Sequence, residues 1–133
     1  MRAVCLVLCS VVLGQWQAFG ASQKHVAAGV WRGEGIELTV GDEGANVEFS
    51  CARAEIKGPI VLDKKGRFEV SGDWYPEHHG PVRDGVPAQQ AKFSGREQGK
   101  TITMTVELVG QESRSLGDFE LVMNGTSRLK KCR

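Results

Sequence analysis

The sequence has almost no excess charge of either sign, no long apolar run beyond its first residues, and few aromatic side chains. Its 133 residues include 17 Lys and Arg against 16 Asp and Glu, which leaves a formal net charge of +1. Such a balance provides no basic stripe for nucleic acid or for an anionic membrane. No apolar stretch after the N-terminus is long enough for a transmembrane helix. With 41% hydrophobic residues, the composition is that of a single globular domain.

The first 22 residues have the organisation of a signal peptide. Arg2 gives a positive start, and residues 3–13 form an apolar stretch of the length found in signal peptides. Small residues between positions 18 and 22 suit cleavage by a signal peptidase. We therefore expect residues 1–22 to be removed and residues 23–133 to form one exported domain, secreted or periplasmic in a bacterium.

Only two of the four cysteines, Cys51 and Cys132, lie beyond this segment. The expected mature domain has 133 − 22 = 111 residues and, because Arg2 is the one charged residue removed, 16 basic and 16 acidic side chains. Two cysteines in an oxidising compartment imply one disulfide, between Cys51 and Cys132. The loop of about 80 residues that it closes is worth roughly 4 to 5 kcal/mol in the chain-entropy model. No CxxC spacing or nearby histidine supports a zinc site instead.

Alternation of apolar and polar residues organises the remainder of the chain. Segments 36–40, 46–51, 67–74 and 101–108 alternate with period two between short turns, and no helical period persists over ten residues. We expect residues 126–132 to form the last strand, after the hairpin dipeptide Asn124-Gly125. About eight antiparallel strands, each with one apolar face, predict an all-β, up-and-down barrel, with a β-sandwich as the alternative. The residues predicted to face inward are Trp31, Leu38, Val47, Phe49, Val70, Phe93, Met104, Val106, Phe119 and Leu121.

A short motif at the first strand resembles a known superfamily. Gly29-Val30-Trp31 opens this strand, and Arg128 stands in the last predicted one. The combination resembles the calycins, which include lipocalins and avidins. In those barrels the tryptophan closes one end and a basic residue packs over it, so the resemblance implies that Trp31 and Arg128 form a barrel-closing pair. The mature segment as a whole is similar to short bacterial secreted proteins of uncharacterised function, and small exported barrels that inhibit proteases or lysozymes share these features.

The loop from Pro76 to Pro87 and the residues before it form the chemically most varied stretch. We select Trp74, Tyr75, Glu77, His78, His79 and Arg83 as candidate binding residues, because aromatic side chains beside a Gly- and Pro-rich loop suit a recognition surface. Adjacent histidines point to opposite sides of an extended chain, so we expect solvated side chains here and no metal or cofactor.

Motifs for catalysis are missing from the sequence. It contains no GxSxG, no HExxH and no glycine-rich phosphate loop, and the disulfide would consume both mature thiols. We therefore expect a monomeric, non-catalytic binding protein, with three hypotheses for its role. A small apolar ligand enters the barrel opposite Trp31; or an exported enzyme inhibitor or protein-interaction module acts through its end loops; or the protein is a structural component of the envelope. Bulky inward side chains, which largely fill a short eight-stranded barrel, favour the loops and rims.

Overall fold

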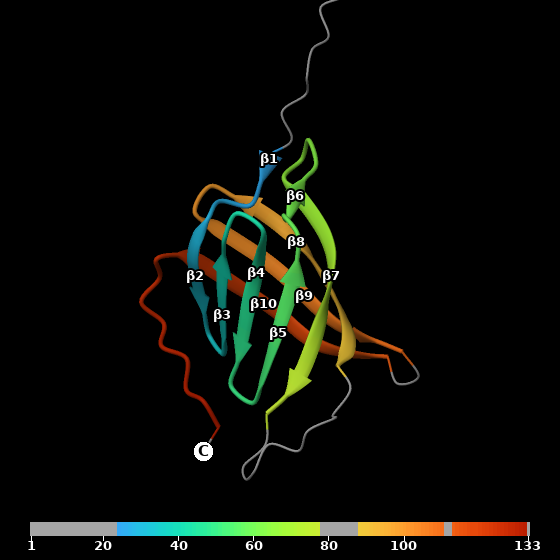
Figure 1. The fold of residues 1–133 in the computed structure, drawn as a ribbon. Helices are drawn as coiled ribbons and strands as arrows, with labels where there is room; N and C mark the ends of the chain where they lie inside the picture. Colours follow the sequence, from blue (N-terminus) through green and yellow to red (C-terminus); the bar gives the residue numbers. More distant parts are fainter. Residues whose placement is uncertain (1–23, 78–87, 111–112, 133) are drawn as a thin grey trace, which may run out of the picture.

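The computed structural model describes residues 24–77, 88–110 and 113–132, which form β-strands and no helix (Figure 1). Eight strands build the main sheet: β2 (Gly29–Gly33), β3 (Ile36–Val40), β4 (Gly44–Phe49), β5 (Ala52–Lys57), β7 (Arg67–Pro76), β8 (Gln89–Gln98), β9 (Thr101–Val109) and β10 (Arg114–Met123). Two short strands, β1 (Lys24–His25) and β6 (Val61–Leu62), pair separately. Within these ranges no helix is long and apolar enough to cross a membrane.

The main sheet closes into an antiparallel barrel, as predicted, and is not a sandwich. Its strand order is β10-β2-β3-β4-β5-β7-β8-β9. Successive barrel strands therefore pair with each other, and the last one, β10, pairs with the first, β2. The ring closes where β10 meets β2, with Leu121 opposite Gly33, Val122 opposite Arg32 and Met123 opposite Trp31. Closure pairs the last barrel strand with the first, so neither is an open edge along its whole length.

Apolar side chains from every barrel strand fill the interior. Nearly all of the predicted inward residues are buried; Val70 and Phe119 are half-buried and pack against the others. An eight-stranded barrel has an interior just wide enough for side chains, so residues of this size occupy it. Ten large side chains are less than 2% exposed: Trp31, Ile36, Leu38, Val47, Phe93, Ile102, Met104, Val106, Leu108 and Leu121.

Two inward-facing glycines make room for aromatic rings. A Cβ at Gly72 would lie 2.7 Å from the carbonyl oxygen of Glu55 and 3.1 Å from the ring of Phe93. At Gly95 a Cβ would overlap the carbonyl oxygen of Thr103 and lie 3.0 Å from the ring of Phe68. Glycine therefore allows both the close approach of the strands and the packing of the two rings.

One end of the barrel, here called the closed end, is covered by the segment that precedes β2. The β1–β6 pair lies at this end (Figure 1), and the buried Val26 donates its backbone N–H to the carbonyl of Ile60, which is also buried. Trp31 is fully buried and donates from Nε1 to the carbonyl of Ala27 at 3.0 Å. The sequence analysis did not anticipate Val26 and Ile60 as a cover.

The predicted last strand is wrong. Residues 125–132, here called the strap, are irregular and run along the outside of the barrel from the end of β10, beside β2, to the end of the barrel opposite the closed end (Figure 1). Asn124 ends β10 in the left-handed conformation, with φ of 53°, and so turns the chain outward instead of making a hairpin. β10 pairs with β9 on one side and, through residues 121–123, with β2 on the other, so the end of β10 from which the strap leaves already has a partner strand on both sides.

The strap ends at the Cys51–Cys132 disulfide, which confirms the predicted pairing. Cys51 lies in the turn between β4 and β5, and the two Cα atoms are 5.2 Å apart. The bond therefore joins the end of the strap to the end of the barrel opposite the closed end, here called the disulfide end.

Replacing Val106 by Asp will unfold the domain, because this fully buried position offers no partner for a charge, and an unpaired buried carboxylate costs several kcal/mol. Thr103→Asp on the outer face of the same strand is the matched control, since Thr103 is exposed and lies opposite Arg96. Far-UV circular dichroism during urea denaturation measures both. Equal stability of the two variants would contradict the assigned strand faces.

Thiol titration of a denatured, unreduced protein that comprises residues 23–133 will find no reactive thiol, because both of its cysteines lie in the disulfide. The same sample titrated after reduction supplies the positive control. Detection of two thiols before reduction would rule out the bond.

Candidate functional site

A row of polar side chains crosses the outer face of five neighbouring strands. Arg32 on β2 lies opposite Glu37 on β3, Glu37 opposite Glu48 on β4, Glu48 opposite Arg53 on β5, and Arg53 opposite Tyr75 on β7. We call these five residues the outer row. Each residue is one position from the terminus of its strand that lies at the disulfide end. The row therefore runs around five of the eight barrel strands, close to the loops at that end.

Two carboxylates stand side by side at the centre of the outer row. Like charges directly opposite on neighbouring strands repel, so Glu37 and Glu48 need cations nearby. Arg32 Nε lies 3.4 Å from Glu37 Oε2, while the nearest ammonium to Glu48, that of Lys131, is 3.9 Å away. The side chain of Glu48 is 55% exposed and that of Glu37 is 32% exposed. Glu48 is thus the more weakly paired carboxylate and the one more open to a partner.

Arg53 and Tyr75 form the other end of the outer row. The guanidinium carbon of Arg53 lies 4.4 Å from the centre of the Tyr75 ring, and Arg53 Nη1 donates to Glu55 Oε1 at 3.0 Å. Stacking on a cation holds the aromatic ring in place on the surface. A half-buried, pre-oriented tyrosine beside an arginine has the composition of a protein-binding surface.

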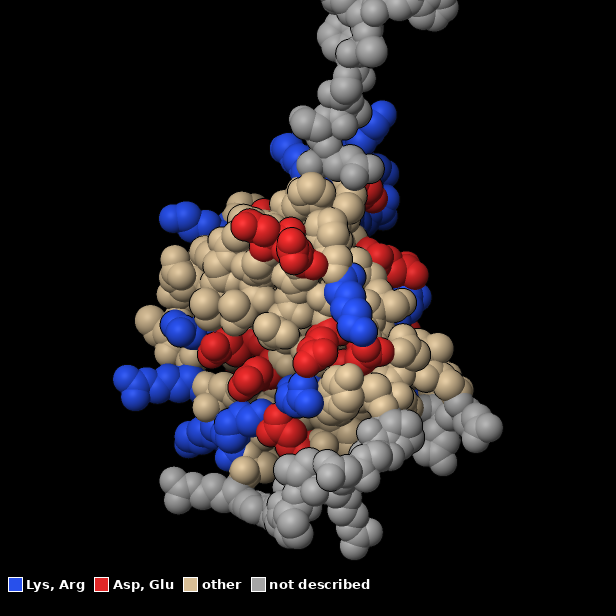
Figure 2. Space-filling model, viewed as in Figure 1, with Lys and Arg blue, Asp and Glu red and all other residues tan. Residues whose placement is uncertain are grey.

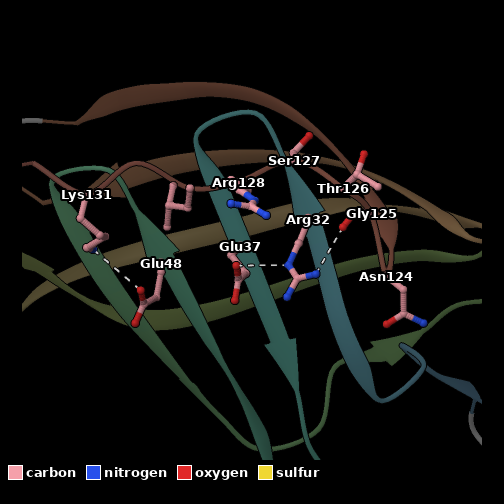
Figure 3. Close-up of a pocket in the computed structure, with 10 residues that line it drawn as sticks. Arg32, Glu37, Glu48, Asn124, Gly125, Thr126, Ser127, Arg128 and Lys131 are labelled. Atoms are coloured by element: carbon pink, nitrogen blue, oxygen red, sulfur yellow. Dashed lines mark hydrogen bonds and ion pairs between the residues drawn. The ribbon is translucent and has the colours of Figure 1, made fainter.

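A cleft separates the strap from the barrel wall. It has a volume of about 720 Å³ and lies between Arg32, Glu37 and Glu48 on the strands and residues 124–129 and 131 on the strap side. Figure 3 shows that side chains from both walls extend into it. A second cleft, of about 330 Å³, adjoins it at Glu37 and Glu48 and continues toward Arg53 and Glu55. In the surface view, acidic side chains occupy the middle of this face and basic ones gather on the side of the strap (Figure 2).

Lys131 fastens the strap to the disulfide end. Its ammonium donates to the carbonyl of Phe49 at 2.7 Å and to that of Ala52 at 3.4 Å, and lies 2.9 Å from Glu77 Oε2. Because Phe49 and Ala52 flank the β4–β5 turn, one side chain ties this turn to the end of β7. The backbone N–H of Glu77 also donates to the carbonyl of Cys51 at 2.9 Å. The turn, the strap and the start of the β7–β8 loop therefore form one connected structure.

Of the candidate binding residues predicted in and after β7, the described ones lie partly inside and partly outside the barrel. Trp74 points inward and packs against the core, Tyr75 belongs to the outer row, and Glu77 binds Lys131. His78, His79 and Arg83 lie outside the described residues. Trp74 Nε1 is buried and has no hydrogen-bond acceptor among the residues that the structure describes.

The structure does not bring the two residues of the calycin-like pair together. Trp31 is fully buried inside the barrel at the closed end, whereas Arg128 is an exposed strap residue that lines the outer cleft (Figure 3). Because the strap leaves the ladder at Asn124, the barrel wall stands between them. The closed end is completed instead by the segment that contains Val26 and Ala27.

No metal site is found among the described residues, and the lowered pKa of Asp63 does not concern the outer row. Within the described ranges no three His, Cys, Asp or Glu side chains are placed to hold a metal ion. The pKa of Asp63 is lowered, above all because the backbone N–H of Arg67 donates to its carboxylate. Asp63 precedes β7 at the closed end, so this effect belongs to a turn and not to the outer row.

Comparison of the chain with protein-family models, with curated proteins and with solved structures gives no match. The eight-stranded antiparallel barrel is compatible with a calycin-like fold. Inference of the function therefore depends on the surface residues of this chain alone.

Lys131→Met will lower the free energy of unfolding by about 1 to 2 kcal/mol, because it removes charged hydrogen bonds to two carbonyls and the ion pair with Glu77. Lys130→Met, one residue earlier on the exposed strap, is the matched control and will change it by less than about 0.5 kcal/mol. Urea denaturation of the oxidised proteins gives both values. An equal effect of the two substitutions would show that Lys131 does not fasten the strap.

Proposed function

We propose that this protein is an exported, non-catalytic binding module that contacts another exported protein through its outer row and the adjoining disulfide end. The observation that carries the proposal is the filled interior. Trp31, Phe93 and Met104 are at most 1% exposed. Because such large side chains fill the interior, we assign recognition to the outer surface of the barrel. The predicted signal segment and the disulfide agree with an oxidising compartment.

The outer row has the chemistry of a protein-binding surface. Tyr75 offers a large contact area at low entropic cost, and Arg53 supplies fixed hydrogen-bond donors. Two carboxylates beside them favour a partner that presents a cation to Glu48, where charge complementarity would set the orientation of docking. The hydrogen bond from the backbone N–H of Glu77 to the carbonyl of Cys51 joins the β4–β5 turn to the start of the β7–β8 loop and keeps this surface rigid, which lowers the entropic cost of association.

A test begins with cross-linking of the tagged full-length chain in living cells, followed by purification of the captured partner. The double variant Glu48→Lys, Tyr75→Ala will weaken binding of that partner at least about tenfold, or roughly 1.4 kcal/mol. Glu43→Lys is the control, because this exposed residue lies in the turn before β4 at the closed end, away from the proposed contact surface. Equal affinities of the row variant and the control would refute the outer row as the contact surface.

One observation favours a second function, binding of a small ligand at the mouth of the barrel. The buried Trp74 Nε1 has no acceptor within residues 24–77, 88–110 and 113–132, and a buried donor without a partner costs about 1 to 3 kcal/mol. A ligand with an acceptor atom would satisfy it. Native mass spectrometry of freshly isolated protein distinguishes the two functions. A co-purifying small molecule that is lost in Trp74→Phe supports the ligand; protein without added mass in both forms supports the outer row.

A further inference from the structure

The strap is attached mainly at its two ends. At its start, Gly125 donates to the carbonyl of Val122 at 3.0 Å and accepts from Arg32 Nη1 at 3.3 Å. At its end, the backbone N–H of Cys132 donates to the carbonyl of Ser50 at 2.7 Å beside the disulfide and Lys131. Between these attachments the strap forms one wall of the 720 Å³ cleft, opposite Arg32, Glu37 and Glu48 (Figure 3).

The barrel does not need the strap for its own closure. The pairing of β10 with β2 is complete at Met123, before the strap begins. All of the buried apolar residues in the described chain lie between Val26 and Leu121. Release of residues 125–132 therefore removes no core side chain and opens no pair of strands.

The bond that holds the strap is accessible to solvent. Cys51 and Cys132 are both exposed, at a turn on the disulfide end. Thiol–disulfide exchange requires that a thiolate reach one of the two sulfur atoms, and exposed disulfides are the ones most readily exchanged. The position of the disulfide thus permits attack without prior unfolding of the barrel.

We propose that the strap is a releasable, partial cover of one end of the outer row, formed by Arg32, Glu37 and Glu48, and that it is held in place by the Cys51–Cys132 disulfide and released by a dithiol reductant. One thiolate of the dithiol attacks a cysteine sulfur, forms a mixed disulfide and displaces the other cysteine as a thiolate. The second thiol of the reductant then resolves the mixed disulfide. Cys51 and Cys132 gain two electrons and two protons, and the dithiol becomes a disulfide. The proposal rests on the proposed function, because the surface that it uncovers is part of the outer row.

Limited trypsin digestion of the mature protein measures release of the strap. Cleavage after Arg128 will accelerate about tenfold on reduction with dithiothreitol, because a protease needs a freed segment. Cleavage after Lys92 and Arg96, within β8, requires unfolding of the barrel and will remain slower than cleavage after Arg128. All samples are reduced after quenching, so that mass spectrometry also detects fragments that the disulfide retained. Unchanged cleavage at Arg128, or cleavage within β8 as fast as cleavage at Arg128, would overturn the proposal.

Carbodiimide labelling of carboxylates measures exposure of the outer row without any partner. Labelling of Glu37, whose side chain is 32% exposed, will rise about twofold on reduction, and labelling of Glu107 on β9 will not. Release of the strap without this rise would show that it is not a cover. Because no partner is present, failure of the proposed function leaves this result unaffected.

Two variants separate reduction from other effects of the reagent. The Cys51→Ser, Cys132→Ser protein will match reduced wild type without dithiothreitol in both assays. A chain that ends at Asn124 will retain the β-sheet circular dichroism spectrum of the oxidised protein. Loss of that spectrum would show that the strap is part of the barrel's structure, and would overturn the proposal.

Discussion

The pairing of β10 with β2 joins the two ends of the sheet, and the remaining features of the molecule depend on it. It brings Met123 opposite Trp31, although the two residues are far apart in the chain. Strands this close leave no room for a side chain at Gly33, where a Cβ would overlap the carbonyl oxygen of Glu120. Once the ring is closed, inward side chains can pack only against one another, and outward side chains meet solvent or the strap. Alternation along each strand thus assigns every residue to the core or to the surface.

This alternation links the core directly to the candidate site. Leu38 and Val47 face inward as a cross-strand pair at full burial, and the next pair along the same two strands, Glu37 and Glu48, faces outward. A register that buries the apolar pair necessarily places two carboxylates side by side outside. The repulsion is relieved by Arg32 on one side and Lys131 on the other. Core packing and the charge pattern of the outer row are therefore two results of one strand register.

Much of the fold could be predicted from the sequence because period-two alternation is a local signal. It identified the strands that contain Leu38, Val47 and Met104, and the closed barrel followed from their one-sided apolar pattern. The strap could not be predicted in the same way, since residues 126–132 have strand-like composition but, after closure, the end of β10 from which they leave already has a partner strand on both sides. The outer row was missed for a related reason: it is contiguous only across five strands, and sequence reasoning found only Tyr75. Arg128 was misplaced relative to Trp31 because its position depends on the left-handed turn at Asn124.

The disulfide has separate effects on the unfolded and the folded chain. In the unfolded chain it closes a loop between residues 81 apart, and that restriction favours folding of the whole domain. In the folded chain it joins a turn to the strap, and neither element contributes a side chain to the buried core. A disulfide between two barrel strands would combine these effects, because its loss would disturb the ladder. Here the two are separable: reduction lowers global stability through the unfolded state, while the local consequence in the native state is confined to the strap and the surface that it covers.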